Sequence, residues 1–348
     1  MNLRSVILLC LAVALLAVPI IAQERSVDEV IKINTTLINI PVIVTDRQGR
    51  YVPDLKQADF GIFQDGVEQP VDFFADTEEP INIAVLIDTS NSTRDVLGDI
   101  KSAAKKMVKL LNANDKAMIV SFDYETHILS PLTDNKEALN KAITKAEIPQ
   151  DLGTTLRDAV DETVRKQFES ITGRKAIILL TDGKDHGSSV TSSQLIYSLQ
   201  ESDVLVYTVY FDTRGFRARI RPEFGDRGVF GGGRRGDFPG DGREPRSPSD
   251  DRRGNSRRDQ RIMTENEFAM GFLQKLSNTT GGRFYDSSKT KFKEAFALVV
   301  DELRHQYRLG FYPSDENQLA RQHSLRIKVM RPDVVIRTRS NYRHKKAN

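Results

Sequence analysis

The residues best suited to chemistry are oxygen-bearing side chains that follow apolar runs of strand length. Asp88, Ser90 and Ser92 come directly after one such run, and Asp182 comes after a later one. Between the two runs, Thr154 opens a helical pattern and offers a further hydroxyl. Oxygen ligands with few formal charges suit Mg²⁺ or Mn²⁺, ions that keep bound waters and leave a coordination position open. The spacing therefore predicts a hard-cation site.

These side chains need elements that bring them together. Apolar runs alternate with amphipathic helical patterns from residue 81 to about residue 304. The expected strands cover residues 81–87, 118–122, 176–180 and 204–211, and the expected helices have apolar faces near residues 96–111, 156–168, 194–199, 268–276 and 292–307. This alternation predicts an α/β fold with a doubly wound, Rossmann-like, mostly parallel sheet that helices cover on both faces. Ligands bind such sheets at the carboxyl ends of the strands, near the switch in strand order, where Asp88 and Asp182 fall.

A different pattern precedes and follows this α/β region. β patterns predict strands over residues 37–44, 60–63, 307–311, 325–329 and 335–338. Asp65-Gly66 before Val67 is a strong hairpin signal. Because both β segments bracket the α/β region, we expect them to join in one flanking, β-sandwich-like domain.

Length and charge limit the classes of function. A chain of 348 residues exceeds the usual size of one domain, so two domains are expected. The 51 basic and 48 acidic residues give a formal net charge of only +3. That balance does not describe a surface built for polyanions, and we expect no specific nucleic-acid partner.

The first residues have the pattern of a secretory signal. Arg4 supplies a positive start, an apolar stretch follows to residue 21, and cleavage is expected between Ala22 and Gln23. No later segment has the length and hydropathy of a membrane span, so the mature protein is expected in the periplasm or outside the cell. The single cysteine, Cys10, lies within the signal, which leaves the mature chain without disulfides or thiolate ligands.

Residues 214–261 interrupt the α/β pattern. They are dense in Arg, Gly, Asp and Pro and contain almost no aliphatic residues. Such a segment cannot bury enough apolar surface to fold, which predicts a disordered insertion. Its arginines leave open contact with a polyanion, and a plain solvated linker is the simpler reading.

Other polar residues carry weaker signals. His127, His305, His323 and His344 are scattered without metal-ligand spacing, and no Ser/His/Asp set follows a nucleophile-elbow motif, so we expect no hydrolase. Four further residues fall in loops that could border the cation site, or simply form a solvated loop face: Asp123, Glu125, Asp185 and His186.

Together, the three loops resemble the von Willebrand factor type A domain. In that family, a metal-ion-dependent adhesion site combines an Asp-x-Ser-x-Ser loop with a distant Thr and a distant Asp. Asp88, Ser90 and Ser92 match the first loop, Thr154 lies in Leu-Gly-Thr-Thr-Leu-Arg-Asp-Ala, and Asp182 lies in Leu-Leu-Thr-Asp-Gly. The flanking β segments are similar to exported bacterial proteins, common in acidobacteria, that are related to this family.

The resemblance implies a fold and a function. Ser90, Ser92 and Thr154 would bind the ion through their hydroxyls, and Asp88 and Asp182 would act directly or through water. Thr155 adjoins Thr154 and leaves open which hydroxyl faces the metal. The open coordination position would accept a Glu or Asp of a protein partner, which gives adhesion without catalysis. The sequence specifies neither that partner nor an oligomeric state.

The expected organisation is a signal over 1–22, a β segment over 23–79, the type A domain over 80–304 and a second β segment over 305–348. Two other functions remain open at this point. The chain could be a structural envelope protein whose metal only stabilises the fold, or it could bind polyanions through residues 214–261.

Overall fold

A computed structural model describes residues 37–76, 79–151, 153–213, 248–313 and 322–344. These residues all belong to one compact unit, Thr35–Asn348. The expected signal over 1–22 and the part of the insertion over 214–247 lie outside the described residues. Within the described ranges, no helix combines the length and the apolar character needed to cross a membrane.

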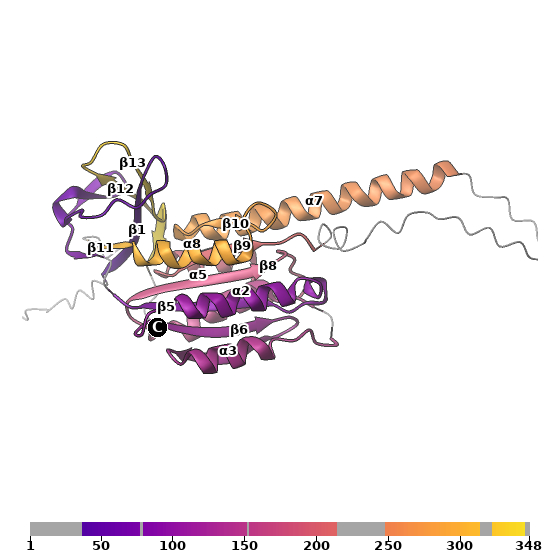
Figure 1. The fold of residues 1–348 in the computed structure, drawn as a ribbon. Helices are drawn as coiled ribbons and strands as arrows, with labels where there is room; N and C mark the ends of the chain where they lie inside the picture. The colour runs from indigo at the N-terminus through magenta and orange to yellow at the C-terminus, as the bar shows by residue number, and fades with distance from the viewer. Residues whose placement is uncertain (1–36, 77–78, 152, 214–247, 314–321, 345–348) are drawn as a thin grey trace, which may run out of the picture. The chain divides into compact units, whose positions relative to one another are not determined.

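A six-stranded sheet forms the centre of the α/β region (Figure 1). Its strands are β5 (Ile81–Asp88), β6 (Lys116–Phe122), β7 (Thr126–Thr133), β8 (Arg174–Thr181), β9 (Leu205–Tyr210) and β10 (Phe284–Asp286). They lie in the order β10-β9-β8-β5-β6-β7, and every neighbouring pair is parallel except β6 with β7. The chain passes from β5 to β6 on one side and later to β8 on the other. The predicted α/β fold and its mostly parallel sheet are confirmed.

Helices cover both faces of this sheet. One face carries α2 (Leu97–Leu110), α3 (Lys136–Lys145) and α8 (Phe292–Arg304), which lie on the near side in Figure 1. The other face carries α4 (Leu156–Glu162), a π-helical turn (Thr163–Gln167), α5 (Ser192–Gln200) and part of α7 (Pro248–Thr280). The apolar stripe of α8, including Phe296, Val299 and Leu303, is buried as expected. Tyr307 was expected both at the end of that stripe and at the start of the next strand. The strand assignment is confirmed, because the helix ends at Arg304 and β11 begins at Tyr307.

Helix α7 differs from the sequence-based expectation. Residues 248–261 were assigned to the disordered insertion, but the structure places them in the first part of this helix. The composition argument concerned the burial of apolar surface, whereas a helix satisfies its own backbone and needs little burial to extend. Once the packed turns around Leu273 and Leu276 nucleate the helix, each added residue costs little, and arginine is a good helix former.

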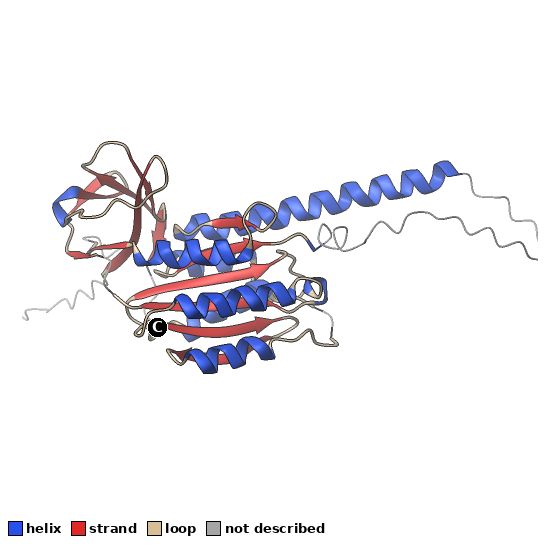
Figure 2. Cartoon of the chain, in the orientation of Figure 1, coloured by secondary structure: helices blue, strands red, loops and turns tan. Residues whose placement is uncertain are grey.

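Two four-stranded antiparallel sheets form the β region (Figure 2). The first has the order β13 (Val334–Arg337), β1 (Ile38–Asp46), β11 (Tyr307–Phe311), β4 (Phe73–Ala75), and the second has the order β14 (Asn341–Arg343), β12 (Gln322–Val329), β2 (Phe60–Gln64), β3 (Val67–Gln69). Strands from the two ends of the chain therefore pair, as expected; Ile38 faces Phe311 in one pair. Their inward side chains share one apolar core.

Two local features fix the edges of these layers. Asp65 and Gly66 both have positive φ, 50° and 86°, which is the type I′ hairpin turn that Asp-Gly favours between β2 and β3. At the opposite boundary, the buried Arg174 of β8 donates to the carbonyls of Leu303 at 3.0 Å and Asp76 at 2.6 Å. This guanidinium therefore joins the sheet to the segments that enter and leave the β region.

Candidate functional site

The strand register brings the ends of β5 and β8 together. Ile87 pairs with Leu180, so Asp88 and Thr181 are neighbours at the carboxyl edge, and Asp182 follows at once. β5 is also the strand from which the chain turns first to one side of the sheet and later to the other. The predicted cation residues of these two strands therefore lie at the switch in strand order.

Asp88 is completely buried and is held by neighbouring donors. The Ser90 backbone N–H donates to Oδ1 at 2.9 Å, and the Thr181 hydroxyl donates to Oδ2 at 2.6 Å. Burial, together with the nearby Asp182 carboxylate, raises the pKa of Asp88 to about 7. The fold thus holds two carboxylates close together in a dry environment, an arrangement that a cation would relieve.

The two serines converge through a short helical turn. Ser90 precedes the turn Asn91–Thr93, whose start is secured because the Thr93 hydroxyl donates to the Ser90 carbonyl at 2.8 Å. The turn brings Ser92 back, and the two serine hydroxyl oxygens lie 3.0 Å apart. Both hydroxyls therefore belong to one polar cluster with Asp88.

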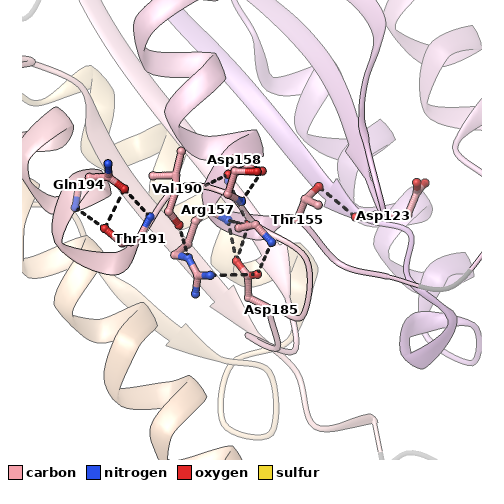
Figure 3. Close-up of polar contacts among 10 residues, drawn as sticks. Asp123, Thr155, Arg157, Asp158, Asp185, Val190, Thr191 and Gln194 are labelled. Atoms are coloured by element: carbon pink, nitrogen blue, oxygen red, sulfur yellow. Dashed lines mark hydrogen bonds and ion pairs between the residues drawn. The ribbon is translucent and has the colours of Figure 1, made fainter.

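Thr154 and Thr155 are distinguished by their hydrogen bonds. Thr155 donates to the Asp123 carbonyl twice, from its N–H at 2.7 Å and from its hydroxyl at 3.0 Å (Figure 3). Thr154 uses its carbonyl to accept from the N–H groups of His186 and Gly187 at 3.0 and 3.1 Å. Its hydroxyl has no hydrogen-bond partner among the residues that the structure describes, although only 4% of the residue is exposed.

A lysine accompanies the second carboxylate. Lys184 donates its N–H to Asp182 Oδ1 at 3.2 Å, and its ammonium lies 2.6 Å from Oδ2. Asp182 is buried, whereas the Lys184 side chain is partly exposed. In this state, the ammonium supplies the positive charge nearest to the pair formed by Asp88 and Asp182.

Asp185 does not form the solvated loop face that was one of its two expected roles, because its side chain is only 6% exposed. Its carboxylate accepts from the Arg157 N–H at 2.9 Å and the Ser188 hydroxyl at 2.7 Å, and it pairs with the Arg157 guanidinium (Figure 3). It therefore caps the first turn of α4, which Thr155 does not cap with its own side chain. Asp158 of α4 joins the same two segments by accepting from the N–H groups of Ser189 and Val190 at 2.9 and 2.8 Å.

Asp123 is likewise internal. Its side chain accepts from the Thr89 hydroxyl at 3.1 Å and lies 3.1 Å from His127 Nε2, so it connects the end of β5 to the hairpin between β6 and β7. Glu125 and His186 remain exposed, as a loop face requires. Both carboxylates are buried, so the solvated-face interpretation of Asp123 and Asp185 was wrong. No signal in a single sequence distinguishes a buried loop carboxylate from an exposed one.

The donor set contains oxygen atoms only. The structure places Asp88, Ser90 and Ser92 in one cluster and Asp182 beside it, and it connects Thr154 to the loop that follows Asp182. Across the described ranges, no group of three or more His, Cys, Asp or Glu residues is arranged to hold a metal. Two carboxylates with three hydroxyls match a hard ion that retains waters better than a soft one.

Comparison with solved structures gives similar proteins of low identity. BatB from Bacteroides thetaiotaomicron is 20% identical with a TM-score of 0.33, and 38% of this chain covers 66% of it. An aerotolerance-related membrane protein from Bacteroides fragilis is 18% identical with a TM-score of 0.42, and 64% of this chain covers 98% of it. The mussel byssus protein PTMP1, solved with a zinc-occupied MIDAS motif, is 21% identical with a TM-score of 0.35. The matches cover 39% of both this chain and PTMP1.

Sequence comparison adds a family. A search of curated proteins finds no significant match to the chain. The family model for the von Willebrand factor type A domain matches residues 82–221. This range begins in β5 and includes all five residues of the candidate site. With the sheet order and the positions of its loops, this match shows that the chain contains a von Willebrand factor type A domain.

Proposed function

We propose that the chain is an exported, non-enzymatic binding protein that uses a divalent metal to capture an acidic side chain of a protein partner. Asp88, Ser90, Ser92, Thr154 and Asp182 would hold the ion, which we propose to be Mg²⁺ or Mn²⁺. When bound, the ion would supply a positive charge with an open coordination position, to which a Glu or Asp of the partner can bind.

The observation that carries this proposal is the convergence of the three loops at one sheet edge. Ser90 and Asp88 are hydrogen-bonded to each other, and Asp182 is close enough to raise the pKa of Asp88. The Thr155 hydroxyl donates to the Asp123 carbonyl. The Thr154 hydroxyl has no partner among the described residues, which favours Thr154 as the metal ligand. Oxygen donors without a base or nucleophile beside them support binding rather than catalysis.

The family and the sequence supply the remaining parts of the proposal. Type A domains are typically interaction modules rather than enzymes, and many bind a divalent metal. Export follows from the secretory pattern of residues 1–22, which lie outside the described residues. The periplasm or the cell exterior is therefore the proposed location.

The test is capture from an envelope extract by the mature chain, residues 23–348, with Mg²⁺, with EDTA, and with Asp88→Ala in Mg²⁺. We expect one partner that is retained only with Mg²⁺ and intact Asp88. Asp286→Ala is the matched control because Asp286 ends β10, at the same edge of the sheet but away from β5. It should capture the partner normally.

A second arm tests the acidic ligand. Amidation of the carboxyl groups in the extract should abolish capture, whereas amine acetylation should leave it intact. Capture that is indifferent to Mg²⁺, EDTA and Asp88→Ala would overturn the proposal. In that case, a fall in melting temperature with EDTA would instead favour a structural protein whose metal only stabilises the fold.

A further inference from the structure

Buried polar atoms without a hydrogen-bond partner gather at the last two strands. Within the described part of the chain, this corner of the second β sheet contributes Gln64 Oε1, His323 Nε2, Tyr342 Oη and His344 Nε2 to that set. Unpaired buried donors and acceptors are rare in folded proteins, and a group of them indicates a bound water or ion. The corner therefore has the character of an incomplete site.

His323 is oriented as a metal-binding histidine would be. It lies on β12 opposite Tyr342 of β14, and only 1% of it is exposed. Its Nδ1 is 2.7 Å from Asp65 Oδ2 and 3.3 Å from the Gln64 side-chain nitrogen. Because an ionised carboxylate can only accept, we assign the proton to Nδ1, which donates to Asp65. The Nε2 lone pair is left free, which is the arrangement in which a carboxylate positions a metal-ligating imidazole.

His344 brings a second free imidazole nitrogen to the same place. It follows Tyr342 by two residues, so both side chains project from the same side of the extended chain. The rings of His323 and His344 have centroids 5.6 Å apart with planes at 83°, and both rings contact Tyr342 at 5.2 and 5.4 Å. His344 Nε2 is buried and has no hydrogen-bond partner among the residues up to 344 that the structure describes.

We propose that Nε2 of His323 and Nε2 of His344 bind one transition-metal ion of the zinc class. Zn–N bonds of about 2.0 Å at a tetrahedral angle place the centroids of two imidazoles about 5 Å apart, close to the separation observed here. Water molecules complete the coordination, and the Tyr342 hydroxyl offers an acceptor for one of them. Imidazole nitrogen selects Zn²⁺, Cu²⁺ or Ni²⁺ over Mg²⁺, so this site differs in chemistry from the oxygen cluster at Asp88.

The surrounding charges set the strength of this site. Asp65 provides a carboxylate behind His323, whereas the Arg339 guanidinium lies 5.8 Å from the Tyr342 ring centroid and opposes a dication. With only two protein ligands, the site is expected to bind zinc less tightly than a four-ligand structural site and to exchange it readily. Binding would fasten the short strand β14 to β12, since the two histidines lie on these neighbouring segments.

The test uses the untagged full chain carrying Asp88→Ala, so that zinc cannot be held by the oxygen cluster. Calorimetric titration with Zn²⁺ in excess Mg²⁺ should show one site. His344→Gln should weaken zinc binding at least tenfold; because His344 follows the last strand, the variant should fold, which its unchanged metal-free melting temperature would verify. His127→Gln, which removes a histidine that also contacts a carboxylate, is the matched control and should bind zinc normally.

Pulsed electron paramagnetic resonance of the Cu²⁺-loaded protein identifies the ligands directly. Couplings from the remote nitrogens of two imidazoles are expected, and His323→Gln or His344→Gln should each remove one. Zinc affinity that is the same in the His344→Gln protein, or copper spectra without imidazole couplings, would overturn the proposal and assign the unpaired atoms to water alone.

Discussion

The two polar clusters of this molecule are completed in opposite ways. At the carboxyl edge of the central sheet, Asp88 already accepts hydrogen bonds from Ser90 and Thr181, and Lys184 places an ammonium on Asp182. At the β12–β14 corner, buried nitrogen and oxygen atoms, including His323 Nε2, have no partner. The carboxylates of the first cluster therefore have donors from the protein itself, whereas the second cluster leaves buried atoms unsatisfied within the described residues.

The difference arises from how far apart the contributing residues are in sequence. In the Asp88 cluster, a local turn fixes the Ser90 donor, and the adjacent parallel strand β8 supplies the Thr181 donor from 93 residues further along the chain. The His323 corner joins β2, β12 and β14, whose registers bring His323, Tyr342 and Asp65 together from distant parts of the chain.

The largest effect should come from Asp88→Ala. The variant removes the carboxylate shared by the Ser90 and Thr181 hydrogen bonds and should weaken Mn²⁺ binding by about 1,000-fold, which is about 4 kcal/mol. Mn²⁺ binding can be followed by electron paramagnetic resonance, with Asp286→Ala as the control. A loss of less than tenfold would show that the cluster is not the metal site and would remove the basis of the comparison.

The next effect concerns stability and pH in the absence of metal. The pKa of Asp88 is raised from 3.8 to about 7, so the folded state holds the proton more tightly than the unfolded state. Proton binding by Asp88 therefore adds to the free energy of unfolding below about pH 4. This stabilisation is lost as the pH rises through 7, by roughly 2 to 4 kcal/mol in total. In urea, Asp88→Asn should remove this dependence, and Mg²⁺ should restore the stability of the wild-type protein at pH 8. An unchanged pH dependence in Asp88→Asn would contradict the assignment.

The two threonines should separate metal binding from stability. Thr154→Val removes a hydroxyl without a partner among the described residues and should weaken Mn²⁺ binding by roughly 30-fold with little change in stability. Thr155→Val removes the hydroxyl that donates to the Asp123 carbonyl, which should cost about 1 kcal/mol of stability and leave the metal affinity nearly unchanged. The reverse pattern would assign the ligand to Thr155.

The smallest effect is expected at Lys184. A divalent ion must compete with the Lys184 ammonium for Asp182, so Lys184→Met should raise the Mn²⁺ affinity about fivefold. Lys175→Met is the matched control, because Lys175 makes a similar ion pair with Asp203 at 2.8 Å from the start of β8, away from the site. A fall in affinity in the Lys184 variant would show instead that the lysine supports the metal-bound state.

Much of the fold and the outline of the site could be predicted from the sequence. The apolar runs defined the strands of the central sheet, and the polar residues at their ends marked the carboxyl edge. Asp65-Gly66 defined its turn because the backbone conformation is determined locally. These features depend on residues that are close in the chain, which a single sequence displays directly.

The remaining features depend on partners that only the folded chain brings together. Asp185 caps α4 from another loop, and His323 meets His344 across two strands. Helix α7 begins at Pro248 because the helix extends from its packed turns, and the apolar content of its first residues does not decide this. Spacing along the chain therefore placed Asp88 and Asp182 at the carboxyl edge of the sheet. It could not assign the threonine hydroxyl or find the histidine pair.

The pairing of β1 with β11 sets an order of events during synthesis. β1 lies between β11 and β13, so both of its neighbours are made after the whole α/β region. The Leu55 N–H that donates to the Tyr307 hydroxyl must wait for a partner 252 residues further along the chain. Until the last strands are made, strand β1 lacks both of its neighbours, so its edges stay unpaired and this part of the β region cannot complete its fold.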